Sequence, residues 1–147
     1  MATRPLAVVA RQRYRVPPER IFRAFTEPAM LTRWFSPSTE VSIEVLGHDL
    51  QPAGRYRFRY REANGTISIV AGTFREIVAP TRLVFTWSWE APDPHAGTET
   101  LVTVECAADP GGTLVTVTHD RFPDERSRDR HDDGWRGTLA RLRALAP

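Results

Sequence analysis

Two histidines near the end of the chain stand beside carboxylates, a combination that enzymes use for general acid–base catalysis. His119 precedes Asp120, and His131 precedes Asp132 and Asp133. A carboxylate can orient a histidine whose pKa lies near neutral pH, so each group is a candidate base. Adjacent residues, however, point to opposite faces of a strand and fan around a helix. We therefore predict that neither histidine forms a catalytic pair, and we assign no catalytic residue.

A metal site is the second chemistry that the triplet His131–Asp133 suggests, because imidazole and carboxylate groups bind divalent ions. The spacing puts the three side chains on different sides of a helix, and carboxylates near a helix N-terminus interact favourably with its dipole. We therefore interpret the triplet as a helix entry and predict no metal. The one cysteine, Cys106, excludes an internal disulfide and a multi-cysteine zinc site, and we expect a buried, inert thiol. Phosphate-binding glycine loops and nucleophile elbows do not occur, so we predict no cofactor.

Arginines alternate with aromatic residues over Arg55–Arg61, a mixture that is typical of single-strand nucleic-acid binders. In a strand, however, the arginines and the aromatic residues face opposite sides, so no surface offers both. Glu40 and Glu44 alternate outward on the preceding strand, where ion pairs with these arginines would use them fully. We therefore predict neither an acid–base pair of carboxylates nor a nucleic-acid partner.

The composition is that of one ordinary globular domain. The 147 residues are 41% hydrophobic and 26% charged, and all 20 basic residues are arginine, with a net charge of only +2. So small an excess is weak evidence for a nucleic-acid partner. The apolar run Leu6–Ala10 is too short for a signal peptide or a membrane span. We expect a single domain over residues 1–147, located in the cytoplasm and without a membrane partner.

The elements that position these residues follow from hydrophobic periodicity and turn signals. Prolines open two short helices after the first strand, and residue alternation then predicts six strands before a final helix. The predicted strands are Leu6–Tyr14, Val41–Val45, Arg55–Arg61, Thr66–Val78, Leu83–Glu90, Thr98–Ala107 and Thr113–His119; the predicted helices begin at Val16–Glu19, Pro28 and Asp124.

The final segment, Asp124–Pro147, is the only predicted long helix. His131, Trp135 and Leu139 recur at helical spacing and form its apolar stripe. Gly134 lies inside the helix, where glycine costs roughly 1 kcal/mol relative to alanine. We therefore expect close packing at Gly134.

Six successive strands with short turns predict an antiparallel meander with one apolar face. One long helix must cover this face, and a curved sheet around one helix leaves space beside it. Tyrosine and tryptophan combine apolar bodies with polar tips, which suits a ligand pocket. We predict a cavity bordered by an aromatic set: Tyr56, Phe58, Tyr60, Phe85, Trp87, Trp89 and Trp135.

Several motifs together resemble a known family. They are VPPERIFRAFTEPAMLTRWF, the stretch Gly72–Pro80, LVFTWSWE, GGTLVTVTH and the final GW-xxx-L-xx-L. In this order they are similar to the bacterial homologues of the activator of the heat-shock-protein-90 ATPase, in the START-like (SRPBCC) superfamily. The resemblance covers Ala7–Ala146. One departure is Ala53-Gly54, where the family usually has two glycines.

This resemblance implies an α+β helix-grip fold. Its seven-stranded curved antiparallel sheet wraps around a long C-terminal helix, with two short helices between the first two strands. It also implies a deep hydrophobic cavity between the sheet and that helix.

The default activity that the resemblance implies is binding of a small hydrophobic ligand, aromatic or lipid-like. We expect His119 to be its main polar contact. The full predicted ligand-binding set is Trp34, Tyr56, Phe58, Tyr60, Phe85, Trp87, Trp89, His119, His131, Trp135 and Leu139. Two alternatives stay open: a polyketide cyclase- or aromatase-like enzyme, and a regulatory module that interacts with a chaperone. A homodimer through a strand face or edge also stays open.

Overall fold

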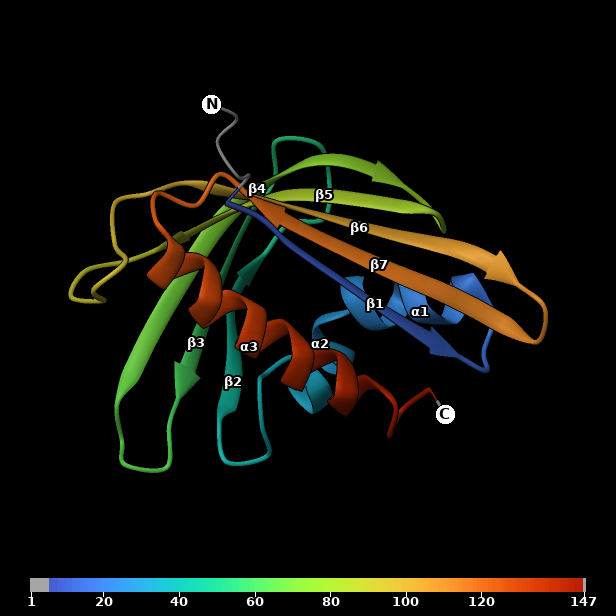
Figure 1. Cartoon of the computed structure of the whole chain (residues 1–147), viewed down its shortest axis with the longest axis horizontal. Helices are drawn as coiled ribbons and strands as arrows, with labels where there is room; N and C mark the ends of the chain where they lie inside the picture. The colour runs from blue at the N-terminus through green and yellow to red at the C-terminus, as the bar shows by residue number, and fades with distance from the viewer. Residues whose placement is uncertain (1–5, 147) are drawn as a thin grey trace.

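The computed structural model describes residues 6–146, which form three helices and a seven-stranded antiparallel sheet (Figure 1). This arrangement confirms the predicted fold. The strands are β1 (Val8–Tyr14), β2 (Ser42–His48), β3 (Arg55–Arg61), β4 (Ile67–Val78), β5 (Arg82–Trp89), β6 (Thr100–Asp109) and β7 (Gly112–Asp120). The helices are α1 (Pro18–Thr26), α2 (Pro28–Trp34) and α3 (Glu125–Leu142).

The sheet order is β1-β7-β6-β5-β4-β3-β2, so β1 and β2 form its two edges. Helices α1 and α2 carry the chain from one edge to the other. Strands β2 to β7 then return as a meander, and β7 pairs with β1 in antiparallel register from Val8↔His119 to Tyr14↔Thr113. Short turns between successive strands favour this pairing of sequence neighbours.

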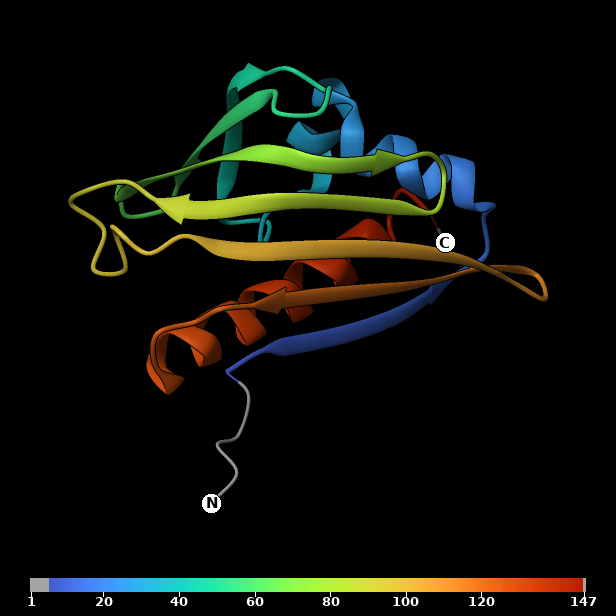
Figure 2. The same ribbon diagram turned by 90° about the horizontal axis from the view of Figure 1, so that it is seen from above.

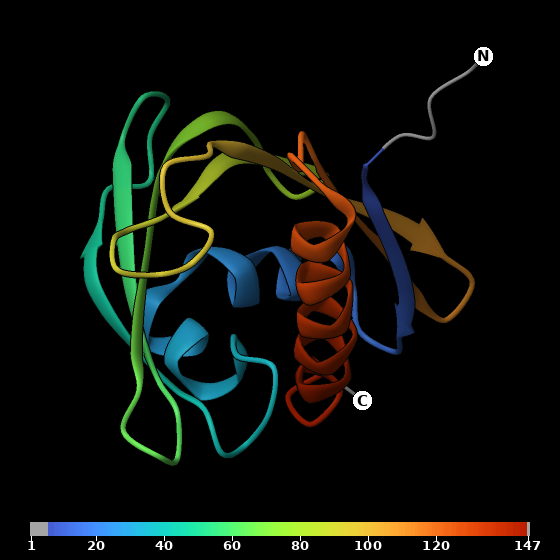
Figure 3. The ribbon, with the colours of Figure 1, turned by 60° about the vertical axis from the view of Figure 1, so that its left-hand side comes forward.

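The sheet curves around the helices. Figure 3 shows all three helices on its concave side, with α3 between the two arms of the curve. Figure 2 looks onto the outer face, with strands β4 to β6 in front of the helices. The space inside the curve is therefore bounded by α3, by the inner face of the sheet and by the α2 region.

Two register shifts help the sheet to bend. One lies between Val45 and Gly47 in the β2–β3 pair, and the other lies between Phe74 and Glu76 in the β4–β5 pair. Such irregularities increase local twist and bend the strand. Close by, a Cβ atom on Gly72 would lie 2.0 Å from the backbone oxygen of Thr86. Only glycine allows this close approach of β4 to β5.

Helix α3 begins one residue after Asp124, whose side chain accepts a hydrogen bond of 2.8 Å from the backbone N–H of Ser127. This N-cap satisfies one of the free N–H groups of the first turn. The prediction that His131–Asp133 form the helix entry is wrong, because the helix already starts at Glu125. The triplet lies in the second and third turns of the helix.

The close packing expected at Gly134 occurs instead at Gly137. A Cβ atom on Gly137 would lie 2.1 Å from the backbone oxygen of Pro37, whereas one on Gly134 would meet nothing within 4 Å. Helix α3 therefore touches the segment between α2 and β2 at Gly137. One turn earlier, at Gly134, the same face of α3 is open.

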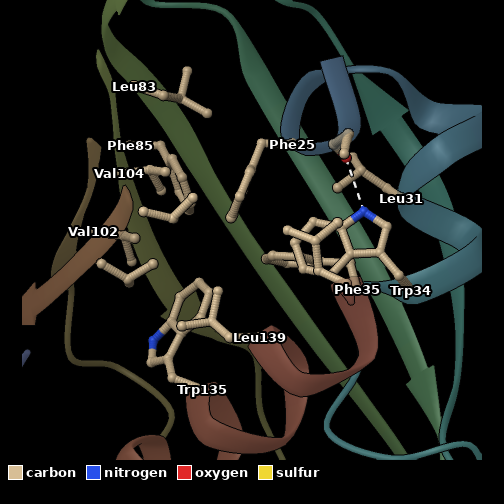
Figure 4. Packing of buried hydrophobic residues seen from close by; sticks show 14 of the residues in the cluster. Phe25, Leu31, Trp34, Phe35, Leu83, Phe85, Val102, Val104, Trp135 and Leu139 are labelled. Carbon is tan, nitrogen blue, oxygen red and sulfur yellow. Dashed lines mark hydrogen bonds between the residues drawn. The ribbon is translucent and has the colours of Figure 1, made fainter. Parts of the chain in front are cut away.

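The apolar core fills the part of the curve around α1 and α2. Trp34 is completely buried, and its indole N–H donates to the backbone oxygen of Ala24 over 2.9 Å (Figure 4). Phe25 and Phe35 pack edge-to-face against Trp34, with ring centroids 4.8 and 5.2 Å away. On the other side, the Tyr14 hydroxyl donates to the backbone oxygen of Leu139 over 2.7 Å, which fixes β1 to α3.

Candidate functional site

A cavity of about 400 Å³ lies between α3, strands β3 to β5 and the segment after α2. Its walls are mainly apolar and rich in aromatic rings, and polar groups gather where α3 and the β3–β4 hairpin reach the surface. Its lining residues are Phe35, Pro37, Val41, Tyr60, Glu62, Ser68, Trp87, Trp89, Arg130, His131, Asp133, Gly134, Trp135 and Thr138.

Three tryptophans form the aromatic wall. Trp87 and Trp89 stand perpendicular on β5, with ring centroids 5.5 Å apart. Trp135 approaches Trp87 from α3 at 6.2 Å. Tyr60, on β3, lies 6.0 Å from Trp89. Rings at these distances attract one another beyond the effect of burial alone, which holds the wall in place.

Trp89 and His131 are joined by a hydrogen bond of 2.9 Å from the indole N–H to Nε2. The other ring nitrogen, Nδ1, lies 2.7 Å from the backbone oxygen of Ser127. A carbonyl oxygen only accepts, so Nδ1 carries the proton and Nε2 is the acceptor. Burial lowers the pKa of His131 to about 4, which keeps the ring neutral at physiological pH.

His119 has the opposite tautomer. The indole N–H of Trp135 donates to Nδ1 over 3.0 Å, so the proton lies on Nε2. This Nε2 lies 2.7 Å from the hydroxyl of Thr100, which donates in turn to the backbone oxygen of Trp87 over 2.8 Å. The chain of bonds links α3, β7, β6 and β5, and each of its members has a partner.

The two imidazoles lie close together, with ring centroids 4.9 Å apart. Burial, together with the nearby His131, lowers the pKa of His119 well below its ordinary value. A tryptophan N–H already occupies the acceptor nitrogen of each ring. Neither histidine therefore offers a free base. His119 lies behind the aromatic wall and His131 lies within it, and both accept hydrogen bonds from its tryptophans.

Of the four indole N–H groups, only that of Trp87 has no hydrogen-bond partner among residues 6–146. The group is buried, and a buried donor without an acceptor costs on the order of 1–3 kcal/mol. Trp87, a residue of the cavity wall, therefore contains one unsatisfied buried donor.

Arg130 and Asp93 form a bidentate ion pair at the edge of the cavity, with N···O distances of 2.8 and 2.9 Å. The Asp93 side chain is only 3% exposed. Its burial acts to raise its pKa, but the bonds from Arg130 and from the backbone N–H of His95 outweigh burial and lower the pKa. The guanidinium carbon of Arg130 also lies 4.6 Å from the centre of a Trp89 ring. The β5–β6 loop is thus fixed to α3 beside Trp89.

Five of the eleven residues predicted to bind a ligand line this cavity: Tyr60, Trp87, Trp89, His131 and Trp135. The other six do not line it. Tyr56, Phe58 and Phe85 border a separate void of about 10 Å³, which is too small for a ligand. Trp34 and Leu139 are buried in the core, and His119 is 0% exposed behind Trp87 and Trp135. As a ligand-binding set, all eleven stay a prediction.

Sequence reasoning missed most of the polar lining. Ser68 faces Tyr60 across the β3–β4 pair, and Thr138 follows Gly134 by one helical turn. Both positions follow from register and helical periodicity once the wall is known. Phe35, directly after α2, was not predicted to line the cavity, and Arg130 gave no local signal because its partner Asp93 lies 37 residues away.

Of the two glutamates predicted to face outward, only one forms the expected ion pair with an arginine of β3. Glu44 pairs with Arg59 across the β2–β3 pair. Glu40 precedes β2 and makes no ion pair within the described part of the chain, while Arg57 pairs instead with Glu90 at 2.8 Å. Residues 6–146 contain no group of three or more side chains placed to hold a metal ion. None of the helices in the same range is long and apolar enough to cross a membrane.

The fold closely matches several solved structures. A protein from Chromobacterium violaceum superposes with a TM-score of 0.87 at 25% identity, covering 95% of this chain and 96% of the other. The AHSA1 protein from Silicibacter pomeroyi superposes with a TM-score of 0.82 at 24% identity and the same coverage, 95% and 96%. No curated protein matches the chain in sequence.

The sequence itself matches the family model of the activator of Hsp90 ATPase homolog 1-like proteins over residues 15–146. The matched region includes every element except β1. It also contains all residues of the aromatic wall and both buried histidines. The chain therefore belongs to the family of activator of Hsp90 ATPase homolog 1-like proteins.

Proposed function

We propose that this protein binds a small hydrophobic molecule, with an aromatic or lipid-like body, in the cavity beside α3. The observation that carries the proposal is the cavity of about 400 Å³ with its wall of three tryptophans and a tyrosine. Ligand pockets are typically about 300–1,000 Å³ in volume and mainly apolar, with few polar groups.

Gly134 supports the same proposal. It lies inside α3, where alanine would stabilise the helix, and no atom lies within 4 Å of the Cβ position. A larger side chain at this position would enter the cavity. Glycine therefore keeps the space open without a packing reason of its own.

The geometry favours binding over catalysis. A general base needs a free acceptor nitrogen within reach of the reacting proton. The acceptor nitrogens of His119 and His131 are already bonded to Trp135 and Trp89. No specific observation supports the cyclase-like alternative or an interaction with a chaperone.

Filling the cavity tests the proposal. We expect N-phenyl-1-naphthylamine, a neutral fluorescent probe, to bind the wild-type protein with increased emission. Gly134→Leu should abolish this signal while the protein stays folded, because the leucine side chain enters empty space. Gly134→Ala controls for helix propensity, and Ala140→Leu, at an exposed position of the same helix, controls for added apolar surface. Equal probe binding by wild type and Gly134→Leu would refute the proposal.

A further inference from the structure

The charged groups that line the cavity are mainly acidic. Glu62 and Asp133 line it, and neither makes an ion pair with any residue from 6 to 146. Arg130 is the one lining cation, and Asp93 already pairs with it in bidentate geometry. His131 is neutral because burial lowers its pKa. The cavity therefore has two carboxylates without a counter-ion.

This local charge is opposite to that of the whole chain. The protein carries a net charge of +2 and 20 arginines, so the composition alone does not predict an excess of carboxylates at one site. Arg61 is adjacent to Glu62 but alternates with Tyr60, which puts its side chain on the outer face of β3. The acidic lining is thus a property of the cavity and not of the composition.

The aromatic wall suits the same charge. Tryptophan faces attract cations through the ring quadrupole, most strongly when the cation is shielded from water. Trp89 already has one such contact, with Arg130 at 4.6 Å on one ring face. Trp87, Trp135 and Tyr60 line the cavity itself. A positively charged group at the mouth of the cavity would therefore lie beside aromatic rings, with the exposed Glu62 and Asp133 as counter-ions.

We infer that the ligand is an organic cation: a molecule with an aromatic or alkyl body and an ammonium-type head near Glu62 and Asp133. This inference rests on the proposed function, because it names the chemical class of ligand for the same cavity. It also excludes fatty acids and other organic anions as preferred ligands, since two unpaired carboxylates would repel them.

Three probes of similar shape isolate the effect of charge. Phenyltrimethylammonium, tert-butylbenzene and benzenesulfonate each join a phenyl ring to a tetrahedral group, with positive, zero and negative charge respectively. Dissociation constants can be measured by quenching of tryptophan fluorescence. We expect the cation to bind about tenfold more tightly than the neutral probe, and the anion to bind most weakly.

Variants in which the two lining carboxylates are neutral test whether these carboxylates cause the preference for a cation. In E62Q/D133N the affinity for phenyltrimethylammonium should fall about tenfold, while that for tert-butylbenzene changes less than about twofold. The matched control is E19Q/D49N, which removes the same charge from two exposed residues that line no part of the cavity and make no ion pair within residues 6–146. This control should leave all three affinities within about twofold of wild type, because charges distant from the cavity are screened.

The outcomes separate the inference from the proposed function. If tert-butylbenzene binds and Gly134→Leu abolishes that binding, but the cation binds no better, the inference is wrong and the proposed function stands. Preference for benzenesulfonate, or an equal loss of affinity in the control variant, also overturns the inference. If no probe binds, both fail. Cation preference that disappears only in E62Q/D133N supports both.

Discussion

The indole N–H of Trp89 donates to Nε2 of His131 over 2.9 Å, and the indole N–H of Trp135 donates to Nδ1 of His119 over 3.0 Å. In both pairs a tryptophan at the cavity is held by a neutral histidine. The histidines use different nitrogens as acceptors, and their tautomers are therefore opposite. The orientation of the aromatic wall depends on these two rings staying unprotonated.

Acid should destabilise the protein through these histidines. Burial lowers the pKa of His131 from 6.5 to about 4, and that of His119 in the same direction. Between pH 6.5 and pH 4 the unfolded chain binds more protons at these histidines than the folded chain does. The free energy of unfolding therefore falls as the pH decreases. For His131 the loss amounts to roughly 3 kcal/mol between pH 7 and pH 4.

Urea denaturation measured at a series of pH values between 7 and 5 checks this prediction. His131→Gln keeps an acceptor for Trp89 but does not titrate, and its free energy of unfolding should therefore depend less steeply on pH. A slope identical to that of wild type would show that His131 is not the titrating group.

Removing the Thr100 hydroxyl should destabilise the protein strongly. Thr100→Val has nearly the same shape but leaves the Nε2–H of His119 and the backbone oxygen of Trp87 without their partner. Buried groups left unpaired in this way cost about 1–3 kcal/mol. Thr103→Val is the matched control, since it lies on the same strand but on the opposite, partly exposed face. Thermal unfolding should separate the two variants, and equal melting temperatures would contradict the hydrogen-bond chain.

The two glycines of α3 should respond to alanine in opposite directions. Gly137→Ala puts a Cβ atom 2.1 Å from the backbone oxygen of Pro37, so the α2–β2 segment must shift. We expect a loss of about 1–3 kcal/mol, as for other overpacked sites. Gly134→Ala meets no atom and should gain up to about 1 kcal/mol from helix propensity. Chemical denaturation of the two variants checks the signs, and a stabilising Gly137→Ala would contradict the close approach.

Alternation and proline placement were sufficient to predict the elements. Strand β3 occurs at Arg55–Arg61 and α2 begins at Pro28, as predicted. These signals are local: side chains alternate along a strand, and proline fits the first turn of a helix. The buried positions of Tyr56, Phe58 and Tyr60 follow from the same parity.

The details of the site depend on contacts that local patterns do not contain. Both Gly134 and Gly137 lie inside one helix, and only the path of the chain at Pro37 decides which of them is packed. His119 has the expected inward parity, but Trp87 and Trp135 separate it from the cavity. The Arg130–Asp93 pair joins α3 to a loop 37 residues earlier. How deeply a side chain is buried and which distant residue it pairs with depend on tertiary packing alone.

The central claim, that a ligand occupies the cavity beside α3, is tested most directly by the indole N–H signals in a nitrogen-15 NMR spectrum. The chain has four tryptophans; Trp87, Trp89 and Trp135 line the cavity, and Trp34 is buried outside it. On titration with N-phenyl-1-naphthylamine, the signals of the three lining residues should shift in a saturable way while that of Trp34 stays in place. Four unchanged signals at saturating probe, or an equal shift of Trp34, would contradict the account.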